Sequence, residues 1–222
     1  IPISILATGE RSNFLKCLLL FSVIIFFINS SYLFTSKKIL ITILMSGIFL
    51  SISLSETLYI KQTEFFKRIL KVENPKKISD VIQNIKYFAH YDAALSIFKD
   101  KPLNGVGNKN FRYECSNENH YNENLNFSIH RCTTHPHQIH FELLSEHGLI
   151  GYCLFFYFFF LFIRKNYLNF FKLNDIHILT KNFYLIIFLV PLLPSGSLFS
   201  TFNGSLFWII LALANLNEKR IQ

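Results

Sequence analysis

Residues 149–163 read LIGYCLFFYFFFLFI, a stretch without a charged residue that is followed directly by Arg164 and Lys165. Alone it is shorter than the roughly 20 residues that cross a bilayer as a helix. The amphipathic residues before it can extend it backwards, so we predict one helix over residues 138–163 that runs down into a membrane. The two basic residues at its end are typical of side chains that reach the lipid–water boundary.

Four further apolar blocks flank this stretch. They are residues 14–34, 39–54, 183–193 and 206–216. With 51% hydrophobic and 17% aromatic residues among 222, the chain is neither disordered nor collagen-like. A polar connection is expected over residues 166–181, and a Gly/Ser/Asn turn over 195–205, after Pro191 and Pro194 break the fourth block. The pattern predicts an all-α fold, a polytopic transmembrane helical bundle of five spans.

Charge indicates the orientation of these spans. The net charge of +8 would suggest nucleic-acid binding in a soluble protein. Here the basic residues concentrate in the hairpin tip at Lys37 and Lys38, in the 166–181 connection and in the C-terminal tail, which we therefore expect to be cytoplasmic. Residues 55–148 carry 12 Lys or Arg against 11 Asp or Glu and would lie outside. Three parts are predicted: two transmembrane helices with a basic cytoplasmic tip (1–54), a large and largely helical periplasmic loop (55–148), and two to three transmembrane helices with a short cytoplasmic tail (149–222).

The outer loop contains one clear helical pattern. Apolar residues recur at helical spacing over residues 81–99, and Asp100-Lys101-Pro102 should end that helix. Gly105-Val106-Gly107 resembles the start of a dinucleotide-binding fingerprint, but no strand–helix unit surrounds it, so a turn is predicted.

The four cysteines divide between two settings. Cys115 and Cys132 lie in the outer loop and could pair as a disulfide if that side is oxidising. Cys17 and Cys153 lie in apolar blocks, where small buried residues are expected.

The densest group of chemically active residues is the histidine cluster before residue 149. If a helix starts after Pro136, then His137, His140, Leu144 and His147 share one face. A neutral imidazole at the outer membrane surface could take a proton from a sugar hydroxyl as a general base. The alternative is a set of solvated or helix-capping histidines.

Two other candidate binding sites are a zinc site in the histidine cluster and a diphosphate clamp at Arg11. His135, His137, His140 and Cys132 are zinc-type ligands, but their spacing matches no common zinc motif, so no metal site is predicted. Arg11 precedes the first apolar block and could be either an interface anchor or a bidentate clamp on a diphosphate.

Three stretches carry a resemblance to a known family. They are Thr8-Gly9-Glu10-Arg11-Ser12, the run FKDKPLNGVGN at residues 98–108, and above all Arg131-Cys132-Thr133-Thr134-His135-Pro136-His137-Gln138 leading through Glu146-His147-Gly148-Leu149-Ile150-Gly151. Together they resemble the O-antigen ligase and polymerase family of bacterial inner-membrane glycan enzymes. That family often has His-Asn where this chain has His137-Gln138. The resemblance covers nearly the whole chain as the C-terminal portion of a longer protein, which fits a start at Ile1 with no signal peptide.

The resemblance implies transfer of a glycan from an undecaprenyl-diphosphate carrier at the periplasmic side of the bacterial inner membrane, by a multi-pass protein that needs no metal and no other cofactor. His137 would be the base, and Arg11 would hold the diphosphate together with Arg131 or Arg112. His135 and His140 would contribute to substrate binding. The acceptor would be lipid A–core in a ligase, another carrier-linked repeat unit in a polymerase, or a protein hydroxyl in related members.

As such an enzyme, the protein is expected to bind lipid-linked glycans and membrane lipids and no nucleic acid. Two other classes of protein are alternatives to an enzyme. A transporter would be expected to carry ionisable residues near mid-membrane or repeated broken helices, whereas the charges here concentrate outside the spans. An outer sensor loop on membrane anchors has no supporting motif.

Overall fold

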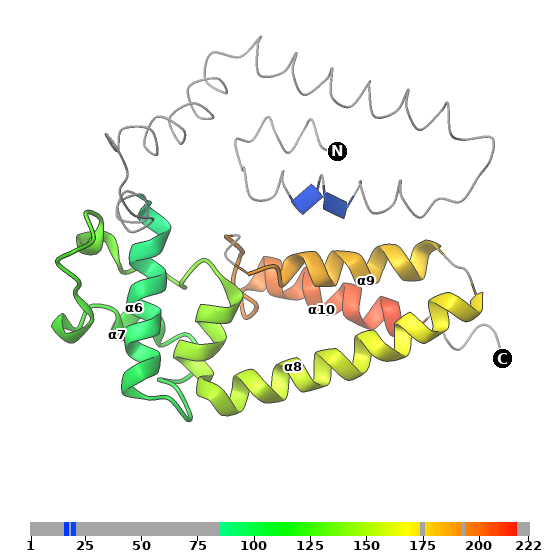
Figure 1. The fold of residues 1–222 in the computed structure, drawn as a ribbon, viewed down its shortest axis with the longest axis horizontal. Helices are drawn as coiled ribbons and strands as arrows, with labels where there is room; N and C mark the ends of the chain where they lie inside the picture. The colour runs from blue at the N-terminus through cyan, green and yellow to red at the C-terminus, as the bar shows by residue number, and fades with distance from the viewer. Residues whose placement is uncertain (1–15, 18, 21–84, 174–175, 192–193, 217–222) are drawn as a thin grey trace, which may run out of the picture.

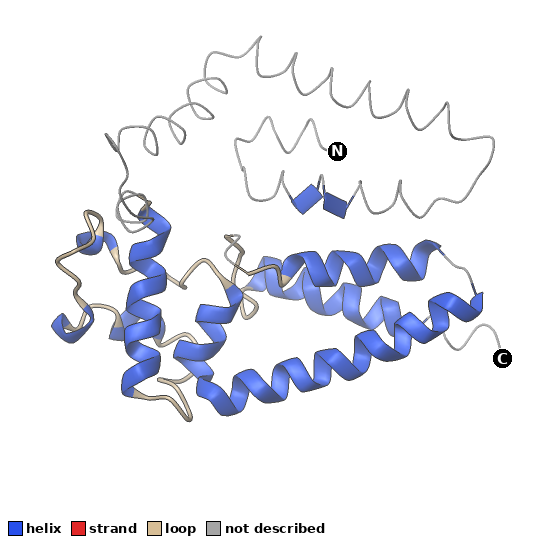
Figure 2. Ribbon diagram, viewed as in Figure 1, coloured by secondary structure: helices blue, strands red, loops and turns tan. Residues whose placement is uncertain are grey.

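The computed structural model describes residues 16–17, 19–20, 85–173, 176–191 and 194–216. This part of the chain is helical and contains no strand (Figure 2). The elements are α6 (Lys86–Asp100), α7 (Phe111–Glu114), the 3-10 turns η1 (Glu118–His120) and η2 (Ser128–His130), α8 (Ile139–Leu173), α9 (Ile176–Phe188) and α10 (Thr201–Leu216). The spans predicted at 14–34 and 39–54, with the tip between them, lie outside the described residues except for four positions in the first.

Helices α8, α9 and α10 pack against one another, and α6 lies across α8 near one end of this group (Figure 1). The helix predicted over residues 81–99 is confirmed from residue 86 on as α6, whereas Ile85, which lies inside the predicted range, has an extended backbone. Its small residues Ala93 and Ala94 are fully buried and let the helix pack closely against Phe111 and Cys115. Lys101 N donates to Ile97 O at 3.0 Å and Pro102 follows, which ends the helix where the sequence predicted.

The predicted single helix over residues 138–163 is wrong in one respect, because α8 kinks at Gly148 (φ 64°, ψ −167°). The kink releases backbone groups, which pair with residues 102–107 instead. Leu149 N donates to Pro102 O at 2.7 Å and Ile150 N to Leu103 O at 3.2 Å. In return, the N–H groups of Val106 and Gly107 donate to the carbonyls of Ser145 and Glu146 at 2.9 and 2.8 Å.

Two glycines permit this backbone-to-backbone contact. A Cβ added to Gly148 would lie 2.3 Å from Leu103 O, and one added to Gly105 would lie 2.4 Å from the carbonyl carbon of Glu146. Both glycines also have positive φ, which side chains disfavour. Residues 102–107 and residues 145–150 therefore form the two sides of one backbone junction around Gly148. The turn predicted at Gly105-Val106-Gly107 lies on the first side.

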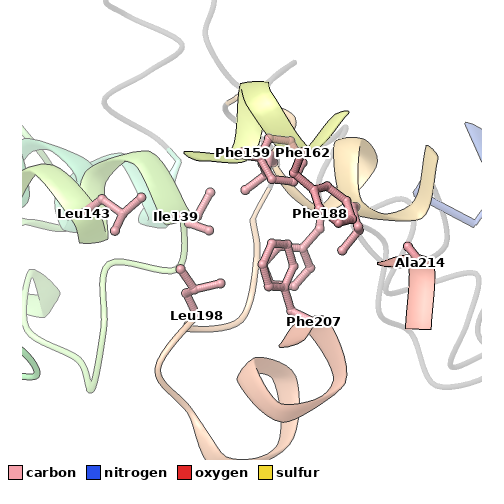
Figure 3. Close-up of a cluster of buried hydrophobic side chains, with 10 residues drawn as sticks. Ile139, Leu143, Phe159, Phe162, Phe188, Leu198, Phe207 and Ala214 are labelled. Atoms are coloured by element: carbon pink, nitrogen blue, oxygen red, sulfur yellow. The ribbon is translucent and has the colours of Figure 1, made fainter. Parts of the chain in front are cut away.

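The second part of α8 packs on α9 and α10 through aromatic side chains. Phe159, Phe162, Phe188 and Phe207 form the centre of this core, and Leu198 joins it from the α9–α10 connection (Figure 3). Residues Ile139–Asn166 are long and apolar enough to cross a membrane, and most side chains in this span are not buried within the protein. Leu154, Tyr157 and Phe160 are all exposed there. An apolar helix with apolar side chains pointing outward suits a lipid environment.

Three sequence expectations in this half need correction. Helix α8 continues to Leu173 and α9 begins at Ile176, so the polar connection expected over residues 166–181 is mostly helical. Helix α10 begins at Thr201, inside the predicted turn over 195–205. Cys153 is exposed and Cys17 is half-buried, whereas both were expected to be buried, because Cys153 lies on the outward side of α8.

Candidate functional site

His137 lies just before α8 and not on it. The expectation that it shares a helix face with His140, Leu144 and His147 is wrong, because α8 begins at Ile139 and His137 has a left-handed backbone (φ 59°). This conformation is uncommon for a residue with a side chain and needs support from its surroundings. That support includes a hydrogen bond from Ser195 N to His137 O at 2.7 Å. The ring is thereby turned away from the helix axis, toward α6.

Gln138 is the N-cap of α8, which explains the amide that follows His137. Its side-chain oxygen accepts the backbone N–H groups of His140 at 2.7 Å and Phe141 at 3.2 Å. Its own carbonyl accepts Glu142 N at 3.0 Å, the first hydrogen bond of the helix. This is the N-cap arrangement usually made by Asn or Asp. The longer Gln side chain makes the same contacts here and sets where the helix starts.

Three histidine rings gather at this point. The ring centroids of His135 and His137 are 4.3 Å apart, and those of His90 and His137 are 5.4 Å apart. Tyr87 packs edge-on against His137 at 5.6 Å. His90 was missed by the sequence reading, although a histidine beside Ala89 on the buried side of a predicted helix signals a side chain that needs a partner. Its Nδ1 donates to Arg131 O at 3.1 Å.

These histidines are kept neutral by their surroundings. Burial, together with smaller contributions from charge repulsion by His135, His90 and Lys86, lowers the pKa of His137 to about 4. Burial is also the main cause of the lowered pKa of His135 and of His90. An imidazole that stays neutral near pH 7 can accept a proton, which is the requirement for a general base.

The two candidate outer arginines differ in their surroundings. Arg131 is 8% exposed, and its guanidinium donates to the carbonyls of Cys115 at 2.8 Å and Ser116 at 3.1 Å. The same group stacks 5.1 Å from the ring centroid of Tyr121. Arg112 is exposed, and its Nε donates to Lys109 O at 3.1 Å. Arg131 therefore holds the loop together, while Arg112 is accessible to a ligand.

Cys115 and Cys132 form a disulfide, with Cα atoms 5.3 Å apart. Cys115 follows Arg112 by three residues, and Cys132 precedes His135 by three. The bridge therefore joins the segment that carries Arg112 to the segment that carries the histidines.

His140, expected to bind substrate, is engaged between helices. Its Nδ1 accepts from the Tyr152 hydroxyl at 2.9 Å, and its Nε2 donates to Leu189 O at 2.8 Å. The ring stacks on Phe156. Both ring nitrogens thus connect the start of α8 to its own later turns and to the end of α9, whereas His135 and His137 lie against α6.

A pocket of about 160 Å³ opens beside His135. It is lined by Lys109, Arg112, Thr134, His135, Glu142, Glu146, Ser197, Ser200 and Thr201. The lining combines two cations, two buried carboxylates and four hydroxyl groups. Within the described residues, no three His, Cys, Asp or Glu side chains are placed to share a metal ion.

Arg11 lies outside the described residues, but Lys16 is described. Lys16 Nζ donates to Pro194 O at 2.8 Å and lies 5.7 Å from the ring centroid of Phe188. Pro194 precedes Ser195, which bonds His137. The start of the first apolar block is therefore next to the segment that holds His137.

Comparison with known proteins identifies the family. The protein-family model described as O-antigen ligase matches residues 1–156. No curated protein and no solved structure gives a significant match. The matched residues include α6, the disulfide, the three histidines and the Gly148 junction, whereas α9 and α10 lie beyond them. Members of this family are inner-membrane proteins with glycan-related, glycosyltransferase-like functions. Because the match spans more than half of its length, the chain belongs to the O-antigen ligase family.

Proposed function

We propose that the protein transfers a saccharide from an undecaprenyl-diphosphate carrier to an acceptor hydroxyl, with His137 as general base. The neutral His137 imidazole removes the hydroxyl proton, and the acceptor oxygen forms a bond to the anomeric carbon. The bond from that carbon to the carrier diphosphate breaks, and its electron pair leaves with the diphosphate. The observation that carries this proposal is the half-buried His137, which is kept neutral among other histidines, has an unusual backbone conformation, and contacts His135, a residue that lines the polar pocket.

The departing diphosphate needs positive charge more than it needs a proton, since it is already a good leaving group. Arg112 supplies this charge, because it lines the pocket next to His135, whereas Arg131 is committed to backbone carbonyls. Arg11 is the second clamp. Lys16 lies five positions after it, so chain geometry keeps their Cα atoms within about 18 Å of each other. The contact of Lys16 with Pro194 makes an approach of Arg11 to this site feasible.

The site faces the periplasm, and residues 55–148 form the periplasmic part between transmembrane segments 1–54 and 149–222. A disulfide within the outer region supports this orientation, because such bridges persist in oxidising compartments. A lipid-linked donor would arrive from the bilayer beside α8, and a hydrophilic acceptor from water.

The acceptor is a sugar of lipid A–core, as in O-antigen ligation for lipopolysaccharide. Polymerisation onto another carrier-linked repeat, or transfer to a protein hydroxyl, uses the same chemistry with a different acceptor. The surface glycans of a deletion strain separate the first two. Unlinked glycan retained on the carrier indicates a ligase, and single repeat units attached to core indicate a polymerase.

The direct test is to measure glycan transfer by the His137→Ala variant in membranes. We expect loss of transfer with normal membrane insertion, because the other groups of the site cannot replace a positioned base; a general base typically contributes about 10²–10⁴-fold. His130→Ala is the matched control, since it also removes an imidazole but from an exposed position. Wild-type transfer by His137→Ala would refute the proposal.

A further inference from the structure

Two buried carboxylates on the first turns of α8 have no part in the chemistry proposed above. Glu142 and Glu146 are each 1% exposed and lie four residues apart, on one face of the helix. Both line the pocket beside His135. A buried carboxylate is costly unless hydrogen bonds satisfy it. The partners of these two carboxylates are therefore informative, and they come from different parts of the chain.

Glu142 holds the segment between α9 and α10. One carboxylate oxygen accepts the Ser197 hydroxyl, and the other accepts Leu198 N at 3.0 Å. Two residues earlier, Ser195 N donates to His137 O at 2.7 Å. The segment thus links the Glu142 carboxylate to the backbone of His137. It lies outside the 1–156 family match, yet it supports the conformation of the candidate base.

Glu146 holds the turn that carries the cations. Its Oε2 accepts Lys109 N at 2.7 Å, and its Oε1 accepts Phe111 N at 3.3 Å. Lys109 has a left-handed backbone (φ 60°), so this turn also needs external support. Arg112 follows directly and bonds back to Lys109 O. Both cations of the pocket therefore depend on the Glu146 carboxylate for their placement.

We propose that Glu142 and Glu146 are positioning residues with separate tasks. Glu142, through residues 195–198, fixes His137 and thereby sets the turnover rate. Glu146, through residues 109–111, fixes Lys109 and Arg112 and thereby sets affinity for the diphosphate of the donor. Lys109 becomes a further cation of that subsite, beside Arg112 and Arg11. This inference rests on the proposed function. It adds that Glu142 controls kcat and that Glu146 controls KM for the donor.

The partners of the two carboxylates predict opposite responses to glutamine. At position 142 one partner is a hydroxyl, which can donate or accept, so an amide can keep both hydrogen bonds. At position 146 both partners are backbone N–H groups. An amide there would place its own N–H₂ group against one of these donors and lose that bond. Glutamine should therefore replace Glu142 but not Glu146.

The experiment measures initial rates of transfer by the full-length protein in proteoliposomes, with the lipid-linked donor titrated at saturating acceptor. For Glu142→Ala we expect kcat to fall by at least about tenfold with little change in donor KM, since two hydrogen bonds to a buried carboxyl group are lost. Glu142→Gln should restore most of kcat. For Glu146→Ala and Glu146→Gln we expect donor KM to rise about tenfold, with kcat little changed.

Several outcomes overturn the inference. These are an unchanged kcat in Glu142→Ala, equal defects in Glu142→Gln and Glu142→Ala, or the same pattern of kcat and KM changes at both positions. Should Glu142→Ala fail to fold, Ser197→Ala decides instead, with a reduced kcat and unchanged donor KM expected and an unchanged kcat refuting the inference. His137→Ala is run in parallel. If it is inactive while Glu142→Ala is normal, only this inference fails, whereas an active His137→Ala removes the proposed function as well.

Discussion

Gly148→Ala should destabilise the protein more than a typical surface substitution. The backbone at Gly148 (φ 64°, ψ −167°) lies in a region that side chains essentially do not adopt, which costs about 1–3 kcal/mol. The added Cβ would lie 2.3 Å from Leu103 O, a backbone atom that cannot rotate away. Moving residues 102–107 aside weakens the four backbone hydrogen bonds of the junction, at roughly 1 kcal/mol each. We expect a total loss of about 3 kcal/mol or more.

The assay is thermal unfolding of the purified protein in detergent, followed by the loss of helical signal at a fixed scan rate. Gly107→Ala is the matched control, because Gly107 also has positive φ (96°), but its added Cβ would meet only the side chain of Asn110. We expect the control to cost about 1 kcal/mol and to lower Tm by a smaller amount. If Gly148→Ala unfolds at the temperature of the wild type or of the control, the junction does not have the role described.

Five further predictions concern the site. Because the pKa of His137 is about 4, transfer should persist into mildly acidic solution and fall as pH drops through about 4. The measurement is kcat/KM against pH, which reports the protein without substrate, and an acid limb above pH 6 would contradict this. The unfolded chain binds this proton below about pH 6.5, so stability should fall between pH 6.5 and 4, and less so in His137→Asn, measured as Tm against pH. Cys115→Ser should lower Tm by an amount equivalent to about 2–4 kcal/mol, with transfer reduced, and a wild-type Tm would count against the bridge. Gln138→Ala should cost about 1 kcal/mol, with Asn restoring most of it, as Tm measurements would reveal. Arg112→Ala should raise donor KM, because Arg112 is accessible to the diphosphate, whereas Arg131→Ala should lower Tm, because Arg131 holds backbone carbonyls. The reverse pattern would make Arg131 the diphosphate ligand and Arg112 the structural residue.

Local sequence signals predicted the elements well. The apolar spacing before Asp100 predicted helix α6, and the Asp100-Lys101-Pro102 stop predicted its end to within one residue. The glycines at 105 and 107 gave a turn, and the charge-free run at 149–163 gave the apolar part of α8. Each of these depends on neighbouring residues, whose preferences are visible in the chain itself.

What the sequence did not predict depends on contacts between distant residues. The helix pattern continues smoothly through Gly148, and the kink appears only because Leu103 lies against it. Arg131 looked like a ligand-binding residue, but its partners are the carbonyls of residues 115–117. Glu142 is bonded to Ser197 across 55 positions, and no periodicity in either segment signals that contact. The shared helix face predicted for His137 was wrong because Ser195, a residue distant in the chain, holds the His137 backbone in a non-helical conformation.

The central claim is that His137 removes the acceptor proton in a reaction that releases the carrier diphosphate. A single-turnover experiment tests it most directly, with carrier-labelled donor bound to the purified protein and acceptor then added. We expect that wild type releases one undecaprenyl diphosphate for each glycan joined to acceptor, and that His137→Ala retains intact donor. Release of carrier diphosphate by His137→Ala at the wild-type rate would contradict it.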